Sequence, residues 1–417
     1  MMKHRIIKKL TKRPVIYLII IFIVIGVASL LLTKAAVPTA SFQAETGARS
    51  GSVTRVDNVP AASGGSHVKF NRASSGSGTF SVVGGDIIGP DGKKFVPIGA
   101  NVGARIKFDC YAFYYCNNSA TGHADDALAW GWNMVRLNVV TDVPSDVTIQ
   151  ETIAGAIALI DEYTAKGIVV MPNSHSVTGT NTPMTDVKYQ NINLFWDAIL
   201  DRYKDNPYVW INYVNEPVTT PVKTGIDTNS EQSDNNSNFW VTLGNQQYQR
   251  VRQKTNNLFV YDLPIWGQQI NELALTTTGE EFLQGKQNVV FSWHNYGGAL
   301  KFDQGWAHGN YNDMTQWAQL VKNKNLPVLT GEFGRSSEAN TPAWVHGNGN
   351  DVDVSADWTF DTWWNYGFGG LWWHGTGTPP NNWNLRMDNS AWYSNSAVPS
   401  ASGERLKAIP GQKPAGY

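Results

Sequence analysis

Residues Tyr208–Pro217 read YVWINYVNEP, an apolar run that ends abruptly in Asn-Glu-Pro. Tyr, Val, Trp and Ile are frequent in β-strands, and proline cannot continue a strand ladder. The run therefore predicts a buried strand whose carboxyl end presents Asn215 and Glu216. A second apolar run, Leu326–Gly334, places Glu332 beside glycines in the same way. Two glutamates from distant strands can face one another only in a fold that gathers strand ends.

Strand-like and helix-like segments alternate around these two runs. Hydrophobic spacing predicts helices at 125–130, 148–166, 191–204, 238–255, 314–322 and 355–366. Residues 80–88, a turn at 89–94 that contains Pro-Asp-Gly, and residues 95–102 should form a short hairpin that leads into the first core strand. Eight strands over roughly 300 residues favour an α/β fold of the closed (β/α)8, or TIM, barrel type, which places its chemistry at the carboxyl ends of the strands. The expected strands are 95–102, 134–140, 168–171, 208–214, 258–261, 289–296, 326–332 and 370–373.

The first 33 residues differ from the rest of the chain. Lysines and arginines between Lys3 and Arg13 precede Val15–Leu32, an apolar segment without charges. As a helix this segment would be about 27 Å long, nearly enough to span a bilayer core. We expect the basic flank to stay in the cytoplasm and the remainder to be extracytoplasmic, either membrane-anchored or secreted after cleavage of a signal peptide. Residues 34–79 are rich in Ala, Gly, Ser and Thr and predict a linker or a short β extension, residues 80–400 the catalytic barrel, and residues 401–417 a C-terminal tail.

Composition excludes some partners. Charged residues are 16% of the chain and its formal net charge is -1, so nothing indicates binding of nucleic acid.

Cys110 and Cys116 are close enough in sequence to form a disulfide in an exported chain, with two reduced thiols as the alternative. No phosphate loop or dinucleotide fingerprint follows a strand, and the loop around Asn350–Asp353 lacks the frame of a calcium motif. We expect no metal or other cofactor, and a monomer.

The predicted strand ends collect polar and aromatic residues. Two carboxyl groups flanking a pocket are the minimum for hydrolysis of a glycosidic bond, because one donates a proton to the leaving oxygen while the other attacks the anomeric carbon or activates water. Mutual repulsion and burial keep the acid protonated while its partner stays ionised. The residues expected at or just past strand ends are Arg136, His175, Asn215, Glu216, His294, Tyr296, Glu332 and Trp373.

Several motifs in a fixed order give the chain a family resemblance. Over about residues 80–390 the chain resembles glycoside hydrolase family 5, the cellulase and mannanase family of retaining (β/α)8 enzymes. Asn-Glu-Pro alone is only moderately specific, whereas the ordered set is strong. The motifs are GWNMVRL at 131–137, RYKDNP at 202–207, NEP at 215–217, HNY at 294–296, GEFG at 331–334 and WW at 372–373.

The resemblance implies roles for the matched residues. Glu216 would be the acid/base and Glu332 the nucleophile. Asn215 would bind the 2-hydroxyl of the sugar at the cleavage point. The other implied positions are Arg136 holding the nucleophile, Tyr296 donating to it, His294 and His175 lining the pocket, and Trp373, or Trp372 in the neighbouring register, as the stacking floor. Trp266 is either a further sugar platform or a core residue.

Three functions from different classes can be compared against this sequence. The first is a retaining hydrolase of a β-1,4-linked polysaccharide, mannan or glucomannan or a cellulose-type glucan, with an exo-acting β-glucosidase as a variant of it. The second is a cell-surface barrel that binds glycans without turnover. The third, a structural protein, does not explain two converging glutamates. Binding without product release would favour the second function over the first.

Overall fold

The structure is a computed structural model that describes residues 53–57, 66–70, 78–103, 124–143, 147–219, 239–301, 305–308, 310–334, 350–373, 401–415 and 417. The chain divides into two compact units, Met1–Ser74 and Ser75–Tyr417. In the first unit, β1 (Val53–Asp57) pairs antiparallel with β2 (Ser66–Phe70). The predicted N-terminal anchor, Cys110 and Cys116 lie outside the described residues. None of the helices that are described is both long and apolar enough to cross a bilayer.

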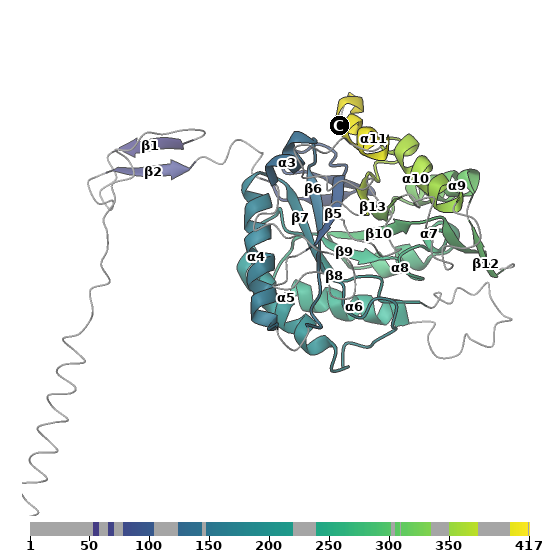
Figure 1. The fold of residues 1–417 in the computed structure, drawn as a ribbon, viewed down its shortest axis with the longest axis horizontal. Helices are drawn as coiled ribbons and strands as arrows, with labels where there is room; N and C mark the ends of the chain where they lie inside the picture. The colour runs from purple at the N-terminus through teal and green to yellow at the C-terminus, as the bar shows by residue number, and fades with distance from the viewer. Residues whose placement is uncertain are drawn as a thin grey trace, which may run out of the picture. The chain divides into compact units, whose positions relative to one another are not determined.

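Parallel strands close into an eight-stranded barrel in the second unit (Figure 1). Each strand pairs with the next along the chain, and the last pairs with the first. This closure confirms the predicted (β/α)8 architecture. The barrel strands are β5 (Ile98–Gly103), β6 (Met134–Val139), β7 (Val169–Ser174), β8 (Ile211–Val214), β9 (Phe259–Asp262), β10 (Val289–Asn295), β13 (Val328–Phe333) and β14 (Gly370–Trp372).

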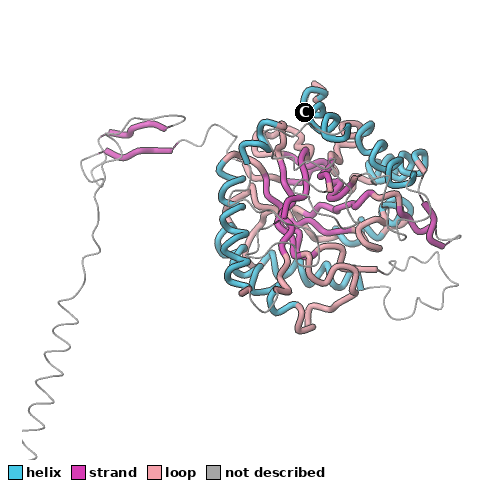
Figure 2. Tube along the Cα trace, in the orientation of Figure 1, coloured by secondary structure: helices cyan, strands magenta, loops and turns pink. Residues whose placement is uncertain are grey.

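Helices surround the strands on the outside of the barrel (Figure 2). The start of α4 follows from its sequence, because Thr148 and Glu151 form a reciprocal capping box. Asn310 and Asp313 cap α9 in the same way. The helices are α3 (Ala124–Ala129), α4 (Ile149–Ala165), α5 (Tyr189–Tyr203), α6 (Phe239–Arg252), α7 (Ile270–Leu275), α8 (Thr278–Leu283), α9 (Tyr311–Asn323), α10 (Asn350–Thr362) and α11 (Ala401–Ala408), followed by the 3-10 turn η4 (Ile409–Gln412).

Two apolar cores hold these layers together. One lies between the barrel and its helices, and the other fills the barrel interior from its amino-terminal end. A small hairpin, β3 (Ser81–Val83) and β4 (Asp86–Ile88), covers that end, where Phe80 packs edge-on against Trp210. The hairpin is shorter than expected because the chain already reverses at Gly84 and Gly85, which both have positive φ. The carboxyl end of the barrel is left for the site.

Some elements were absent from the sequence prediction. Between β9 and β10 the chain forms α7 and α8, and after β10 it forms the antiparallel pair β11 (Gly298–Lys301) and β12 (Gly305–His308). The segment expected as a C-terminal tail contains α11, whose Arg405 bonds Asp357 and Asp361 of α10. The region from 401 onward therefore packs against the barrel's outer helices.

Candidate active site

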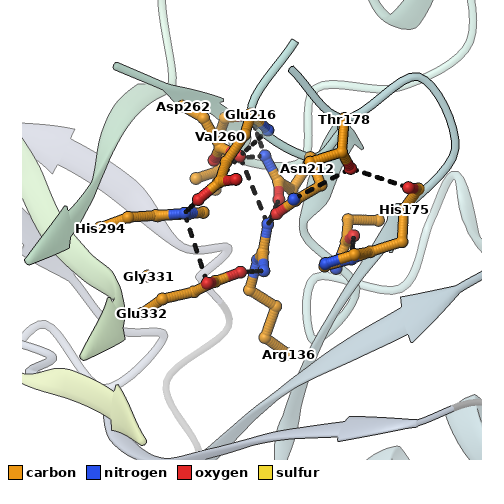
Figure 3. Close-up of polar contacts among 12 residues, drawn as sticks. Arg136, His175, Thr178, Asn212, Glu216, Val260, Asp262, His294, Gly331 and Glu332 are labelled. Atoms are coloured by element: carbon orange, nitrogen blue, oxygen red, sulfur yellow. Dashed lines mark hydrogen bonds and ion pairs between the residues drawn. The ribbon is translucent and has the colours of Figure 1, made fainter. Parts of the chain in front are cut away.

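Glu216 follows β8 in an unusual backbone conformation. Its φ of 41° lies in the left-handed region, which side-chain-bearing residues rarely adopt. The amide N–H of Glu216 donates to Asp262 Oδ2 at 2.9 Å, and its carbonyl accepts from Gly179 N–H at 2.8 Å. These bonds stabilise the strained residue and turn its side chain toward the other strand ends (Figure 3). The side chain keeps 14% of its surface exposed, so its carboxyl group remains accessible.

Glu332 lies at the end of β13, beside an irregularity in the sheet. Trp293 pairs with Thr330 and His294 pairs with Glu332, so Gly331 is an extra residue on β13. Such a bulge re-aims the side chain that follows it. A side chain at Gly331 would not fit, because an added Cβ would lie 2.1 Å from Ser292 Oγ. Glycine at this position therefore lets β13 approach β10 closely enough to bring Glu332 beside His294.

Arg136, in the middle of β6, binds the carboxylate of Glu332. Its Nη1 donates to Glu332 Oε1 at 2.5 Å, and Tyr296 Oη donates to the other oxygen, Oε2, at 2.9 Å. Arg136 is fully buried and would be costly there without acceptors. Its remaining acceptors are mostly side-chain oxygens of neutral amides: Asn101, Asn138, Asn212 and Asn215. Both oxygens of Glu332 are thus held as hydrogen-bond acceptors, one of them by a charged donor.

His294 lies between the two glutamates (Figure 3). Its Nδ1 is 2.6 Å from Glu216 Oε1 and 3.5 Å from Glu332 Oε2. Burial alone would lower the pKa of His294, but the negative charges of Glu332 and Asp262 outweigh burial and raise that pKa well above its usual range. The imidazole is therefore protonated at neutral pH, hydrogen-bonds Glu216 through Nδ1 and forms a longer ion pair with Glu332.

The two glutamates occupy different electrostatic environments. Burial raises the pKa of Glu216 to about 7, and the charges of Glu332 and Asp262 add to the increase while His294 opposes it. One oxygen of Glu216, one oxygen of Glu332 and a ring nitrogen of His294 all lie within 4.8 Å of one another. That spacing would also suit a metal ion. Arg136 and a protonated His294 already neutralise the carboxylates, so the cluster lacks the uncompensated negative charge that would attract a cation.

The remaining predicted residues surround this pair. Asn215 Oδ1 accepts from Arg136 at 2.7 Å, and its Nδ2 donates to Thr178 Oγ1 at 3.2 Å. The ring of His175 stacks on Trp373 with centroids 5.4 Å apart, and His175 Nδ1 lies 2.8 Å from Asn173 Oδ1. The structure thus brings Asn215, His175 and Trp373 to the carboxyl end of the barrel.

The tryptophans at the end of β14 and just after it, Trp372 and Trp373, have opposite environments. Trp372 is fully buried and packs edge-on against Phe333, so it belongs to the core. Trp373 is partly exposed and stacks with His175 at the strand ends. Between the two registers left open by the sequence, Trp373 is therefore the tryptophan that faces the candidate site.

Trp266 lies on the loop after β9, and 39% of its surface is exposed. Ile265, Trp266 and Gly267 all have positive φ, which makes a left-handed turn. Trp266 N–H donates to Val218 O at 3.0 Å, and a Cβ built on Gly179 would lie 2.6 Å from Trp266 Nε1. Core packing does not account for so exposed a ring. The loop holds an aromatic face beside the segment that carries Glu216.

Asp262 is the charged member of the site, among the described residues, that the sequence analysis missed, together with the neutral Asn101, Asn138, Asn212 and Thr178. Its side chain is fully buried and accepts hydrogen bonds from Asn212 Nδ2 and Glu216 N–H, each at 2.9 Å. Burial opposes its ionisation, but the charges of His294 and Arg136 lower its pKa below the usual range. The signal was present, because Leu258–Asp262 is another apolar run that ends in a carboxylate.

Comparison with known proteins agrees with this fold. The sequence profile described as Cellulase (glycosyl hydrolase family 5) matches residues 95–377. A search of curated protein sequences returned no match. Among solved structures, the mannanase catalytic domain from Streptomyces sp. SirexAA-E is 20% identical, covers 81% of this chain and 91% of its own, and has a TM-score of 0.53.

Two glucanases have the same fold. The endoglucanase Cel5A catalytic domain from Thermobifida fusca, solved with cellotetraose, is 15% identical, with a TM-score of 0.53 and coverage of 80% of this chain and 97% of its own. The β-glucanase from Saccharophagus degradans is 17% identical, with a TM-score of 0.55 and coverage of 81% and 95%. At these identities the structures show the fold, whereas the profile spans most of the chain. The chain therefore belongs to the cellulase family, glycosyl hydrolase family 5.

Proposed function

We propose that this member of a glycoside hydrolase family cleaves a β-1,4-linked polysaccharide with retention of anomeric configuration, using Glu332 as nucleophile and Glu216 as acid/base. The observation that carries the proposal is the pairing of two strand-end glutamates, with oxygens within 4.8 Å, of which one has a raised pKa and the other is bound by Arg136. Retaining glycosidases keep their carboxyl groups about 5 Å apart, whereas inverting enzymes leave room for a water molecule between them.

In the first step, a carboxylate oxygen of Glu332 forms a bond to the anomeric carbon while the glycosidic bond breaks. Glu216 gives its proton to the departing oxygen, and an ester joins the sugar to Glu332. In the second step, a water molecule attacks the anomeric carbon, the ester bond breaks, and Glu216 takes the water's proton. Each group thus ends the cycle as it began.

Neighbouring side chains support this assignment. Asn215 is held by Arg136 and Thr178, so its amide is positioned for the sugar's 2-hydroxyl. Trp373, stacked with His175, and the exposed Trp266 offer aromatic faces for the apolar faces of sugar rings. The substrate class is either mannan-type or glucan-type, because relatives of both specificities share the fold. Glucomannan contains both sugars and is the polymer that either specificity should accept.

The first test is reducing-sugar release from glucomannan, galactomannan, carboxymethylcellulose and xyloglucan. We expect release from at least one β-1,4-linked polymer, with its loss in Glu332→Ala. Glu272→Gln is a matched control, since Glu272 is a buried carboxyl group on α7 that bonds only Thr276 and Thr278 among the described residues. Binding of a polymer without any release would support the non-catalytic receptor instead.

A second test separates the two glutamates. Glu216→Ala should still form the glycosyl-enzyme from an aryl glycoside with a good leaving group, because such a group needs no protonation. Azide should then restore turnover by attacking the anomeric carbon as the ester to Glu332 breaks, giving a glycosyl azide of retained configuration. In Glu332→Ala, azide should instead attack the substrate directly and give a glycosyl azide of inverted configuration, which is the result expected when the nucleophile is missing. An inverted azide from Glu216→Ala together with a retained azide from Glu332→Ala would mean that the two roles are exchanged.

We also propose that the barrel is extracytoplasmic. The proposal rests on the sequence alone, on the basic flank before the apolar segment Val15–Leu32. Fractionation of expressing cells, with protease added outside, distinguishes the alternatives. Degradation of a membrane-bound barrel indicates an anchor, recovery in the medium indicates cleavage, and protection from protease would refute export.

A further inference from the structure

Asp262 lies at the centre of the charged network, in contact with Arg136, His294 and the backbone of Glu216. It ends β9, and its side chain has no exposed surface. One oxygen, Oδ1, accepts from Asn212 Nδ2 at 2.9 Å, while Oδ2 accepts from Glu216 N–H at 2.9 Å and from Arg136 Nη2 at 3.3 Å. A carboxylate with these donors around it is held in one orientation.

His294 connects Asp262 to the proposed acid/base. Its Nε2 lies 3.5 Å from Asp262 Oδ2, and its Nδ1 lies 2.6 Å from Glu216 Oε1. Both ring nitrogens therefore face carboxyl oxygens, Nδ1 in a hydrogen bond and Nε2 in a longer ion pair, and the doubly protonated imidazolium suits both contacts. The opposite ends of one imidazole couple the charge of Asp262 to the proton of Glu216.

The charges in this network can be paired one against one. Arg136 from β6 and His294 from β10 are the cations, Asp262 from β9 and Glu332 from β13 are the anions, and Glu216 after β8 faces both kinds. Tyr296 reaches Glu332 as a neutral donor. With two cations and two anions, the network is balanced only when Glu216 is protonated.

We infer that Asp262 is a positioning residue whose negative charge keeps Glu216 protonated before the reaction and whose hydrogen bond fixes the backbone of Glu216. The inference rests on the proposed function. Once Glu332 has become an ester, one anion is lost and the network carries an excess positive charge, which favours release of the proton from Glu216. The same carboxyl group is then ready to act as a base. Without Asp262 the network would carry an excess positive charge already before the ester forms.

The test is the pH dependence of kcat/KM in Asp262→Asn, on the polymer that the wild type cleaves. Removing a negative charge weakens proton binding by Glu216 and His294 alike, so the doubly protonated form dissociates at lower pH. We expect the basic limb to move down by about 1–3 pH units. Glu272→Gln, which also neutralises a buried carboxyl group, should leave the limb in place. A uniform loss of activity with an unmoved limb would overturn the inference.

A second measurement needs no turnover, and its wild-type arm needs no variant. In the full wild-type chain labelled with 15N-histidine, the ring-nitrogen shifts of His294 report its protonation directly. We expect both nitrogens to carry protons at pH 8, and in Asp262→Asn we expect the imidazole to lose its proton about one pH unit or more lower. A neutral His294 at pH 8 in the wild type would refute the inference. Because this titration is independent of catalysis, it separates failure of the inference from failure of the proposed activity.

Discussion

Gly331→Ala tests whether the close approach of β13 to β10 builds the site. The added Cβ would lie 2.1 Å from Ser292 Oγ and 3.2 Å from His294 Nε2, well inside the 3.4 Å at which ordinary van der Waals contact begins. Ser292 is fully buried, so its hydroxyl has little room to move away. The strands must separate locally, which would move Glu332, the residue after Gly331, and His294, which also touches the added Cβ.

The expected cost follows from this geometry. Overpacking a buried site costs about 1–3 kcal/mol of unfolding free energy. A displacement of reacting groups by about 1 Å can lower kcat by a factor of about 100. We therefore expect Gly331→Ala to fold, with a lower Tm and a loss of about two orders of magnitude in reducing-sugar release.

A double variant identifies the cause of that loss. Ser292 Oγ has no hydrogen-bond partner among the described residues, so Ser292→Ala alone should change stability little. Combined with Gly331→Ala it removes the closest contact and should recover most of the lost Tm. Gly411→Ala is the control, because a Cβ there meets nothing within 4 Å. Wild-type activity in Gly331→Ala, or a double variant no better than the single one, would refute the reasoning.

Three further outcomes are expected. Because the pKa of Glu216 is raised to about 7, kcat/KM should fall as pH rises through this value, and a plateau extending well above it would contradict the assignment of the acid. Trp266→Ala should raise KM for long substrates more than it lowers kcat, and an equal effect on a disaccharide glycoside would exclude a platform beyond the cleavage point. Burial raises the pKa of Glu272 to about 7 from an unfolded value near 4.5, so its contribution to stability is greatest below pH 4.5 and is lost as pH rises through 7. Denaturant titrations of Glu272→Gln should lack this decline, and an identical pH dependence in both proteins would refute the burial argument.

The barrel was predictable because its strands are buried on both faces. Runs such as Val289–Phe291 and Ile168–Met171 are continuously apolar, and the helices between them carry clear periodicity. The helices α7 and α8 were missed; each spans only six residues, a length at which periodicity is a weak signal, although the equally short α3 was predicted. Periodicity needs a longer window than that.

The site was predictable wherever a polar residue interrupts an apolar run. Glu216, Glu332 and His294 stand out in this way, whereas Asp262 was excluded because the expected strand stopped at Tyr261. The bulge at Gly331 could not be predicted, since it depends on how β13 packs against the side chains of β10. Backbone strain at Glu216 likewise follows from tertiary hydrogen bonds rather than from local sequence.

The amide side chains around Arg136 explain why the network can act on Glu216 at all. Carboxylates at Asn101, Asn138 or Asn212 would satisfy the guanidinium equally well, but each would add a negative charge to the buried cluster. Neutral oxygens accept the N–H groups without cancelling the positive charge. The charge of Arg136 is therefore left to balance Glu332, and under the proposed mechanism, when the ester consumes the charge of Glu332, the imbalance falls on the group that can titrate near neutral pH, Glu216. An amide shell around the arginine is thus a condition for one carboxyl group to serve first as acid and then as base.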